Sequence, residues 1–159
     1  MDAFSNKLTT NLDLEQQAAA QLLSLLRQEQ SCLVDNEIDG LATLTEEKTK
    51  VVAQMTSLAT GRHRALAFAG FEAGENGMQE WIRRNPGIEA VNKSWTELLA
   101  LAQLAKELNR NNGLLINKHL GRNRNALDVL QGKPQGSNLY GPNGQASSFR
   151  NAARGVVIG

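Results

Sequence analysis

Apolar residues recur every three or four positions along two long stretches of the chain. The first stretch covers about residues 8–71 and the second about residues 88–131. This spacing is typical of amphipathic helices, because residues three and four apart lie on the same helical face. We therefore expect two long helical arms over these residues.

The polar sequence "VDNEIDG" interrupts the first arm. Asp35 or Asn36 could act as the N-cap of a restarted helix, because short polar side chains accept hydrogen bonds from free helical N–H groups. The pattern leaves open whether residues 35–40 break the helix or only bend it. A heptad seam containing one lysine follows, at Leu41, Leu44, Lys48, Val51, Met55 and Leu58.

A turn and a short helix separate the two arms. In "EAGENG" the glycines Gly74 and Gly77 are expected to stop helical structure, and "MQEWIRR" predicts a short helix over residues 78–84. Pro86 ends that helix, because proline disfavours the helical conformation in the residue before it.

The last part of the chain has a different composition. It is rich in Gly, Pro, Ser and Asn, and its isolated apolar residues are too few to offset the entropy lost on ordering. The expected architecture is all-α: an elongated antiparallel helical hairpin or coiled-coil-like bundle in a single domain, residues 1–133, followed by a flexible tail, residues 134–159.

The second arm becomes polar after Leu108. Its main stripe then passes through Asn109, Asn112 and Asn123, although asparagine is a poor helix former. The asparagines could set the register of a permanent seam, could keep an apolar docking stripe soluble until a partner arrives, or could be ordinary surface residues. The docking hypothesis assigns protein binding to Asn112, Leu115, Ile116, Leu120, Leu127 and Leu130.

Other candidate chemistry is scarce. Net charge is +1, which does not favour nucleic acid or an anionic membrane. His63 and His119 have no second metal ligand at helical spacing, and no nucleotide-binding or hydrolase motif is present. We expect no enzymatic activity, catalytic residue, metal or cofactor.

Cysteine content, the N-terminal sequence and the length of apolar runs bear on where the protein is located in the cell. Cys32 is the only cysteine, the N-terminus lacks the features of a signal peptide, and no apolar run is long enough to span a bilayer. We expect a cytoplasmic protein without a membrane insertion.

Three blocks of the sequence resemble the FlgN-type flagellar secretion chaperones. The first arm contains "LLRQE" and, after the interruption, "LATLTEEK". The second arm contains "NRNNGLLINKHLGRNRNALDVLQG", which resembles the "N..NG.LI......ALD.L.G" of the family. The last block is "LYGPNGQ", similar to the "YG..GQ" of the family and containing Tyr140. The blocks occur in the family's order and span roughly residues 8–146.

This resemblance implies an ATP-independent export chaperone of the type III pathway. Family members bind the C-terminal helices of the hook–filament junction proteins FlgK and FlgL, prevent their early assembly and deliver them to the export gate. The family's substrate-binding region lies in the C-terminal half, and Tyr140 is a candidate functional residue by the same analogy. The alternatives are a structural helical-bundle homodimer and a regulatory adaptor, and both a monomer and a homodimer are compatible with the sequence.

Overall fold

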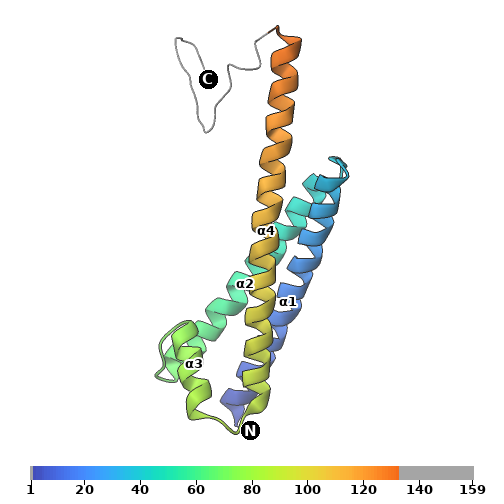
Figure 1. The fold of residues 1–159 in the computed structure, drawn as a ribbon. Helices are drawn as coiled ribbons and strands as arrows, with labels where there is room; N and C mark the ends of the chain where they lie inside the picture. The colour runs from blue at the N-terminus through green and yellow to red at the C-terminus, as the bar shows by residue number, and fades with distance from the viewer. Residues whose placement is uncertain (1, 133–159) are drawn as a thin grey trace, which may run out of the picture. The chain divides into compact units, whose positions relative to one another are not determined.

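The computed structural model describes residues 2–132, which are almost entirely helical. The helices are α1 (Ala3–Val34), α2 (Leu41–Phe68), α3 (Glu75–Arg84) and α4 (Glu89–Leu130). The predicted all-α class is confirmed, and no strand occurs among these residues (Figure 1). The predicted tail, residues 134–159, lies outside the described residues.

The polar interruption breaks the first arm. It therefore consists of two helices, α1 and α2, that lie side by side and run in opposite directions (Figure 1). Asn36 has φ +59° and the N–H of Glu37 donates to the carbonyl of Cys32, so the interruption terminates α1 with a left-handed C-terminal motif. The expectation of an N-cap at Asp35 or Asn36 is wrong, because Gly40 is the N-cap of α2.

The end of α2 repeats this motif. Gly70 has φ +90°, and the N–H of Phe71 donates to the carbonyl of Leu66. A residue without Cβ is suited to this left-handed position. The hairpin is thus closed by asparagine at the end of α1, and glycine ends α2 in the same geometry.

Helix α3 begins earlier than predicted, at Glu75, and includes Gly77. A Cβ on Gly77 would lie 1.7 Å from the carbonyl oxygen of Glu72. This glycine is therefore required by the close approach of the preceding segment to the first turn of α3, and the expectation that it stops the helix is wrong.

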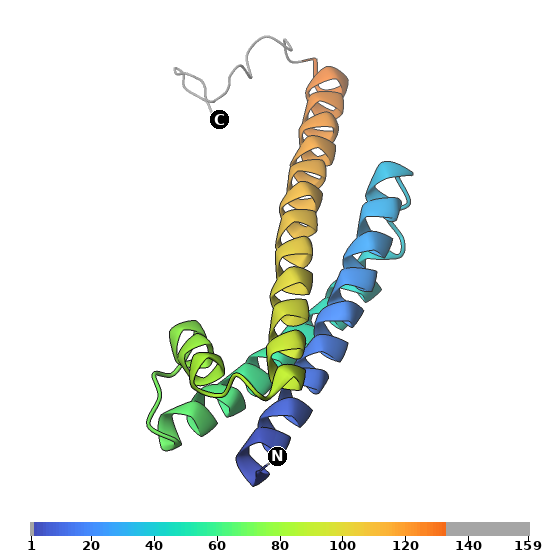
Figure 2. The same ribbon diagram turned by 60° about the horizontal axis from the view of Figure 1, so that its bottom comes forward.

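The chain divides into two compact units, residues 1–115 and 116–159, and α4 contributes to both. In the first unit α4 runs in the same direction as α1 (Figure 2). Gln16 Nε2 donates to the carbonyl of Ser94, and Asn112 Nδ2 donates to the carbonyl of Leu26. The earlier residue of α1 thus contacts the earlier residue of α4 and the later contacts the later, as in a parallel pair of helices. The antiparallel hairpin is thus formed by α1 and α2, and of these two long helices α4 is antiparallel to α2.

All four helices contribute to the main core of the first unit. Its buried members are Leu8, Leu12, Ala19, Leu66, Met78, Trp81, Val91, Trp95 and Leu98. A second, narrower cluster joins only α1 and α2, through Ala18, Leu25, Leu44 and Val51. The seam predicted for the restarted helix therefore packs on α1, where burial of leucine-sized side chains contributes roughly 1.5–3 kcal/mol each.

Two ion pairs, each with a buried carboxylate, cross the α1–α2 seam. Glu15 pairs with Arg62 and Glu29 with Lys48, each at 2.8 Å. Glu29 lies 14 residues after Glu15, and Lys48 lies 14 residues before Arg62, so both pairs follow one antiparallel register over two heptads. The single lysine in the predicted heptad seam is thereby explained, since its partner is a buried carboxylate.

Candidate protein-binding site

The part of α4 in the second unit exposes large apolar side chains. Ile116, Leu120, Leu127 and Leu130 are between 38% and 82% exposed. Apolar side chains of this size normally lose water contact in a folded helix that has a partner. These four residues are the members of the predicted binding set that lie in the second unit.

Their spacing is that of a heptad seam. Together with Asn123, they are separated by four, three, four and three residues. We call the set Ile116, Leu120, Asn123, Leu127 and Leu130 the α4 stripe. At about 100° per residue, these positions occupy one narrow face of the helix, as the a and d positions of a coiled coil do.

The remaining predicted site residues have different surroundings. Leu115 belongs to the first unit and is half-buried. Asn112 also belongs to the first unit and is only 1% exposed, so its side chain is not on an open surface. Tyr140 lies outside the described residues.

The side chain of Asn112 is fully engaged on its donor side. Its amide nitrogen donates to the carbonyl of Leu26 at 2.8 Å and to Glu29 Oε1 at 2.9 Å. The other carboxylate oxygen of Glu29 accepts from Lys48 Nζ. One buried carboxylate thus links α1, α2 and α4, and Asn112 fits the register-setting explanation, whereas Asn109 and Asn123 are exposed.

The ion pair between Glu15 and Arg62 is also linked to α4. The guanidinium of Arg62 lies 4.8 Å from the centre of the Trp95 ring and donates through Nε and Nη2 to Glu15. Both ion pairs therefore hold the three long helices of the first unit together. In the sequence Lys48 stands out as a polar residue in an apolar seam. No pattern in the sequence identifies Glu29 as its partner.

The α4 stripe lies in a basic segment. Residues 116–132 contain Lys118, Arg122 and Arg124 and one acidic residue, Asp128. A helical segment that combines an apolar stripe with a net positive charge favours an amphipathic partner helix of negative charge.

Two other classes of site, a metal centre and a membrane span, have no candidate within residues 2–132. Within residues 2–132, histidine, cysteine, aspartate and glutamate side chains do not gather in groups of three or more that could hold a metal ion. None of the helices in that range is both long and apolar enough to cross a bilayer.

The chain is similar to known proteins over almost its whole length. The family model described as FlgN protein matches residues 1–148. The "Flagella synthesis protein FlgN" of Yersinia enterocolitica serotype O:8 is 30% identical over 154 residues, covering 96% of this chain and 97% of the relative. The proteins of that name from Proteus mirabilis and Escherichia coli K12 are 30% and 27% identical and are covered over 98% and 99% of their lengths.

No solved structure matches the chain significantly. The family match, by contrast, extends over more than nine-tenths of the sequence and includes all three blocks on which the resemblance rested. The chain therefore belongs to the FlgN family.

Proposed function

We propose that the protein is a cytoplasmic chaperone for flagellar export. In this role it binds the C-terminal amphipathic helices of hook–filament junction proteins of the FlgK and FlgL type, prevents their premature assembly and delivers them to the export gate. The name of the relatives, flagella synthesis protein, supports a role in flagellar assembly. The observation that carries the chaperone proposal is the exposed heptad spacing of the α4 stripe.

The stripe supplies the binding energy in this proposal. Four aliphatic side chains are available, and burial of a leucine contributes roughly 1.5–3 kcal/mol before the partner's ordering entropy is subtracted. Asn123 interrupts the apolar face between Leu120 and Leu127. An isolated polar residue in such a seam lowers affinity but selects one register of the partner helix.

The polar character and net positive charge of this segment give the stripe two further properties. The polar residues keep the unliganded helix soluble, and the net charge repels a second copy of the same segment. Because binding is a reversible burial of surface, release requires only a competing partner at the export gate, and no ATP hydrolysis or other catalytic step is proposed.

The proposal is tested by binding of the C-terminal helical segment of a FlgK-type junction protein to the full chain. The double variant Leu120→Asp and Leu127→Asp places two charges in the stripe and should abolish binding measured by calorimetry. Its helical content and melting temperature should stay near wild type, because both leucines are 56% exposed.

A matched control is available on the same helix. Leu114 and Val129 are exposed to nearly the same degree, 57% and 53%, but lie on other faces of α4. The double variant Leu114→Asp and Val129→Asp should bind the client segment like wild type. Equal loss of binding in both double variants, or a collapse of folding in the stripe variant, would contradict the proposal.

A structural homodimer is the second candidate, because a heptad stripe with one asparagine also suits pairing between two copies. Sedimentation over a range of concentrations separates the two functions. A chain that stays dimeric at nanomolar concentration, and becomes monomeric when Leu120 and Leu127 are replaced by Asp, would assign the stripe to the dimer.

A further inference from the structure

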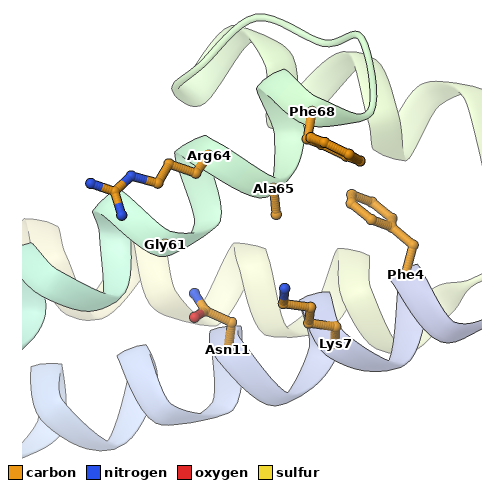
Figure 3. Close-up of a pocket in the computed structure, with 7 residues that line it drawn as sticks. All are labelled: Phe4, Lys7, Asn11, Gly61, Arg64, Ala65 and Phe68. Carbon is orange, nitrogen blue, oxygen red and sulfur yellow. The ribbon is translucent and has the colours of Figure 1, made fainter.

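A groove lies between α1 and α2 in the first unit, far along the chain from the α4 stripe. Its volume is about 400 Å³, and it is lined by Phe4, Lys7, Asn11, Gly61, Arg64, Ala65 and Phe68. In Figure 3 the rings of Phe4 and Phe68 point toward each other across its end, and Lys7 extends into the space between the helices. The groove does not involve α4.

Small residues on α2 leave this space open. Gly61 and Ala65 lie one helical turn apart and face α1, so no large side chain fills the groove from that side. Phe68, about one helical turn after Ala65, is 97% exposed. A fully exposed phenylalanine beside a second, half-buried phenylalanine provides an apolar surface on which another large side chain can be buried.

The charge of the groove is entirely positive. Lys7 and Arg64 line it, both are exposed, and neither forms an ion pair with a carboxylate within residues 2–132. Arg64 extends away from the phenylalanine pair along α2 (Figure 3), so the two cations lie in different parts of the groove. Two unpaired cations around an apolar space favour a ligand that carries carboxylates.

A buried donor lies below the groove. A smaller space beneath it, about 20 Å³, is lined by Leu8 and Arg62 together with residues of the groove. Arg62 Nη1 is buried and has no hydrogen-bond partner, although Nε and Nη2 of the same guanidinium bind Glu15. An orphaned buried donor is unfavourable, so this space is suited to an oxygen atom as acceptor.

We propose that this groove is a second docking site, for an acidic amphipathic peptide of another protein. The peptide places a large apolar side chain against Phe4 and Phe68 and a carboxylate near Lys7. The tail of this chain is a poor occupant, because residues 134–159 contain two arginines and no acidic residue. The proposal does not depend on the function proposed for the α4 stripe.

The test uses fluorescence anisotropy of a labelled short helical peptide built from leucine, phenylalanine and glutamate, added to the full chain. Phe68→Ser, and separately the pair Lys7→Glu and Arg64→Glu, should each weaken binding about tenfold, which corresponds to losing about 1.4 kcal/mol. The same peptide with glutamine in place of glutamate should bind comparably weakly to the wild-type chain.

Two controls keep this test independent of folding and of the other site. The pair Arg27→Glu and Lys50→Glu changes two exposed cations on the same helices by the same total charge and should bind like wild type. The pair Leu120→Asp and Leu127→Asp should also retain binding. Circular dichroism of each variant checks that the helices are intact.

The proposal is overturned by any of three results. These are unchanged affinity in the groove variants, equal binding of the glutamine peptide, and loss of binding only in the α4 stripe variant. Dissociation of a dimeric chain by Phe68→Ser would also overturn it, because the groove would then belong to a second copy.

Discussion

Asn112 donates a 2.9 Å hydrogen bond to Glu29, a residue 83 positions earlier in the chain. The bond joins α4 to α1 inside the first unit, and the other oxygen of the same carboxylate binds Lys48 on α2. A residue type that weakens isolated helices is therefore used here to connect three of them. Both groups are buried, so removing the Asn112 amide nitrogen would leave a buried carboxylate oxygen without this donor.

Replacement of Asn112 by Ala should destabilise the first unit by about 1–3 kcal/mol, because the buried Glu29 oxygen and the Leu26 carbonyl lose their donor. The free energy of unfolding in urea measures this. Asn111→Ala is the control, since Asn111 is exposed on the adjacent position and should change stability by less than about 0.5 kcal/mol. Equal effects of the two variants would contradict the role of Asn112.

The ion pair between Glu15 and Arg62 should show strong coupling. Arg62→Met leaves a buried carboxylate without its partner and is expected to lower stability by about 3–5 kcal/mol. The double variant Glu15→Met and Arg62→Met removes both charges and should be more stable than the Arg62→Met single variant. Urea unfolding of the double-mutant cycle measures the coupling energy, and additive single effects would show that the pair does not act as a unit.

Replacement of a helical glycine by alanine should change stability in opposite directions at Gly113 and Gly77. At Gly113 a Cβ meets nothing within 4 Å, so Gly113→Ala should stabilise the chain by about 0.5–1 kcal/mol through helix propensity. At Gly77 the Cβ would collide with the backbone of Glu72, and Gly77→Ala should be destabilising. Thermal melts of both variants test this, and a stabilising Gly77→Ala would show that the segment before α3 packs differently.

The carboxyl of Glu80 should titrate at unusually low pH. Hydrogen bonds from Arg83 first, and from Arg84, lower its pKa from 4.5 to about 2. Since the folded-state pKa is below the unfolded value, the stabilising contribution is present above about pH 4.5 and is lost as pH falls toward 2.

This titration can be followed by NMR of the Glu80 side chain. Arg83→Gln should raise the Glu80 pKa more than Arg84→Gln, because the contribution of Arg83 is larger. Because the three side chains are on the surface, global stability should change little in either variant. A Glu80 pKa near 4.5 in the wild-type chain would exclude the interaction in solution.

The agreement between sequence and structure differs from helix to helix. The second arm was predicted as residues 88–131 and is observed as Glu89–Leu130, because apolar residues at helical spacing continue to Leu130 and no proline follows Pro86 within the arm. The first arm was ambiguous at residues 35–40, where helix restart and helix termination share the same short polar residues. Asn36 in the left-handed conformation decides for termination.

The candidate site also contains residues that the sequence could predict and residues that it could not. The apolar positions Ile116, Leu120, Leu127 and Leu130 could be found from their types and spacing. Asn112 could not be separated from Asn109 and Asn123, because all three lie on one predicted stripe and differ only in what stands opposite them. The groove beside Phe68 had no pattern in the sequence, since its lining comes from two helices about fifty residues apart.

Local periodicity, caps and breakers were enough to determine that this chain is all-α, where α4 begins and ends, and which residues form an apolar stripe on it. Those properties depend on neighbours within one or two helical turns. Only the tertiary structure decided that α1 and α2 form the hairpin, that Lys48 forms an ion pair with Glu29 and that Asn112 is buried. The physical reason is that burial and pairing depend on the atoms of another helix, which no spacing within a single helix can specify.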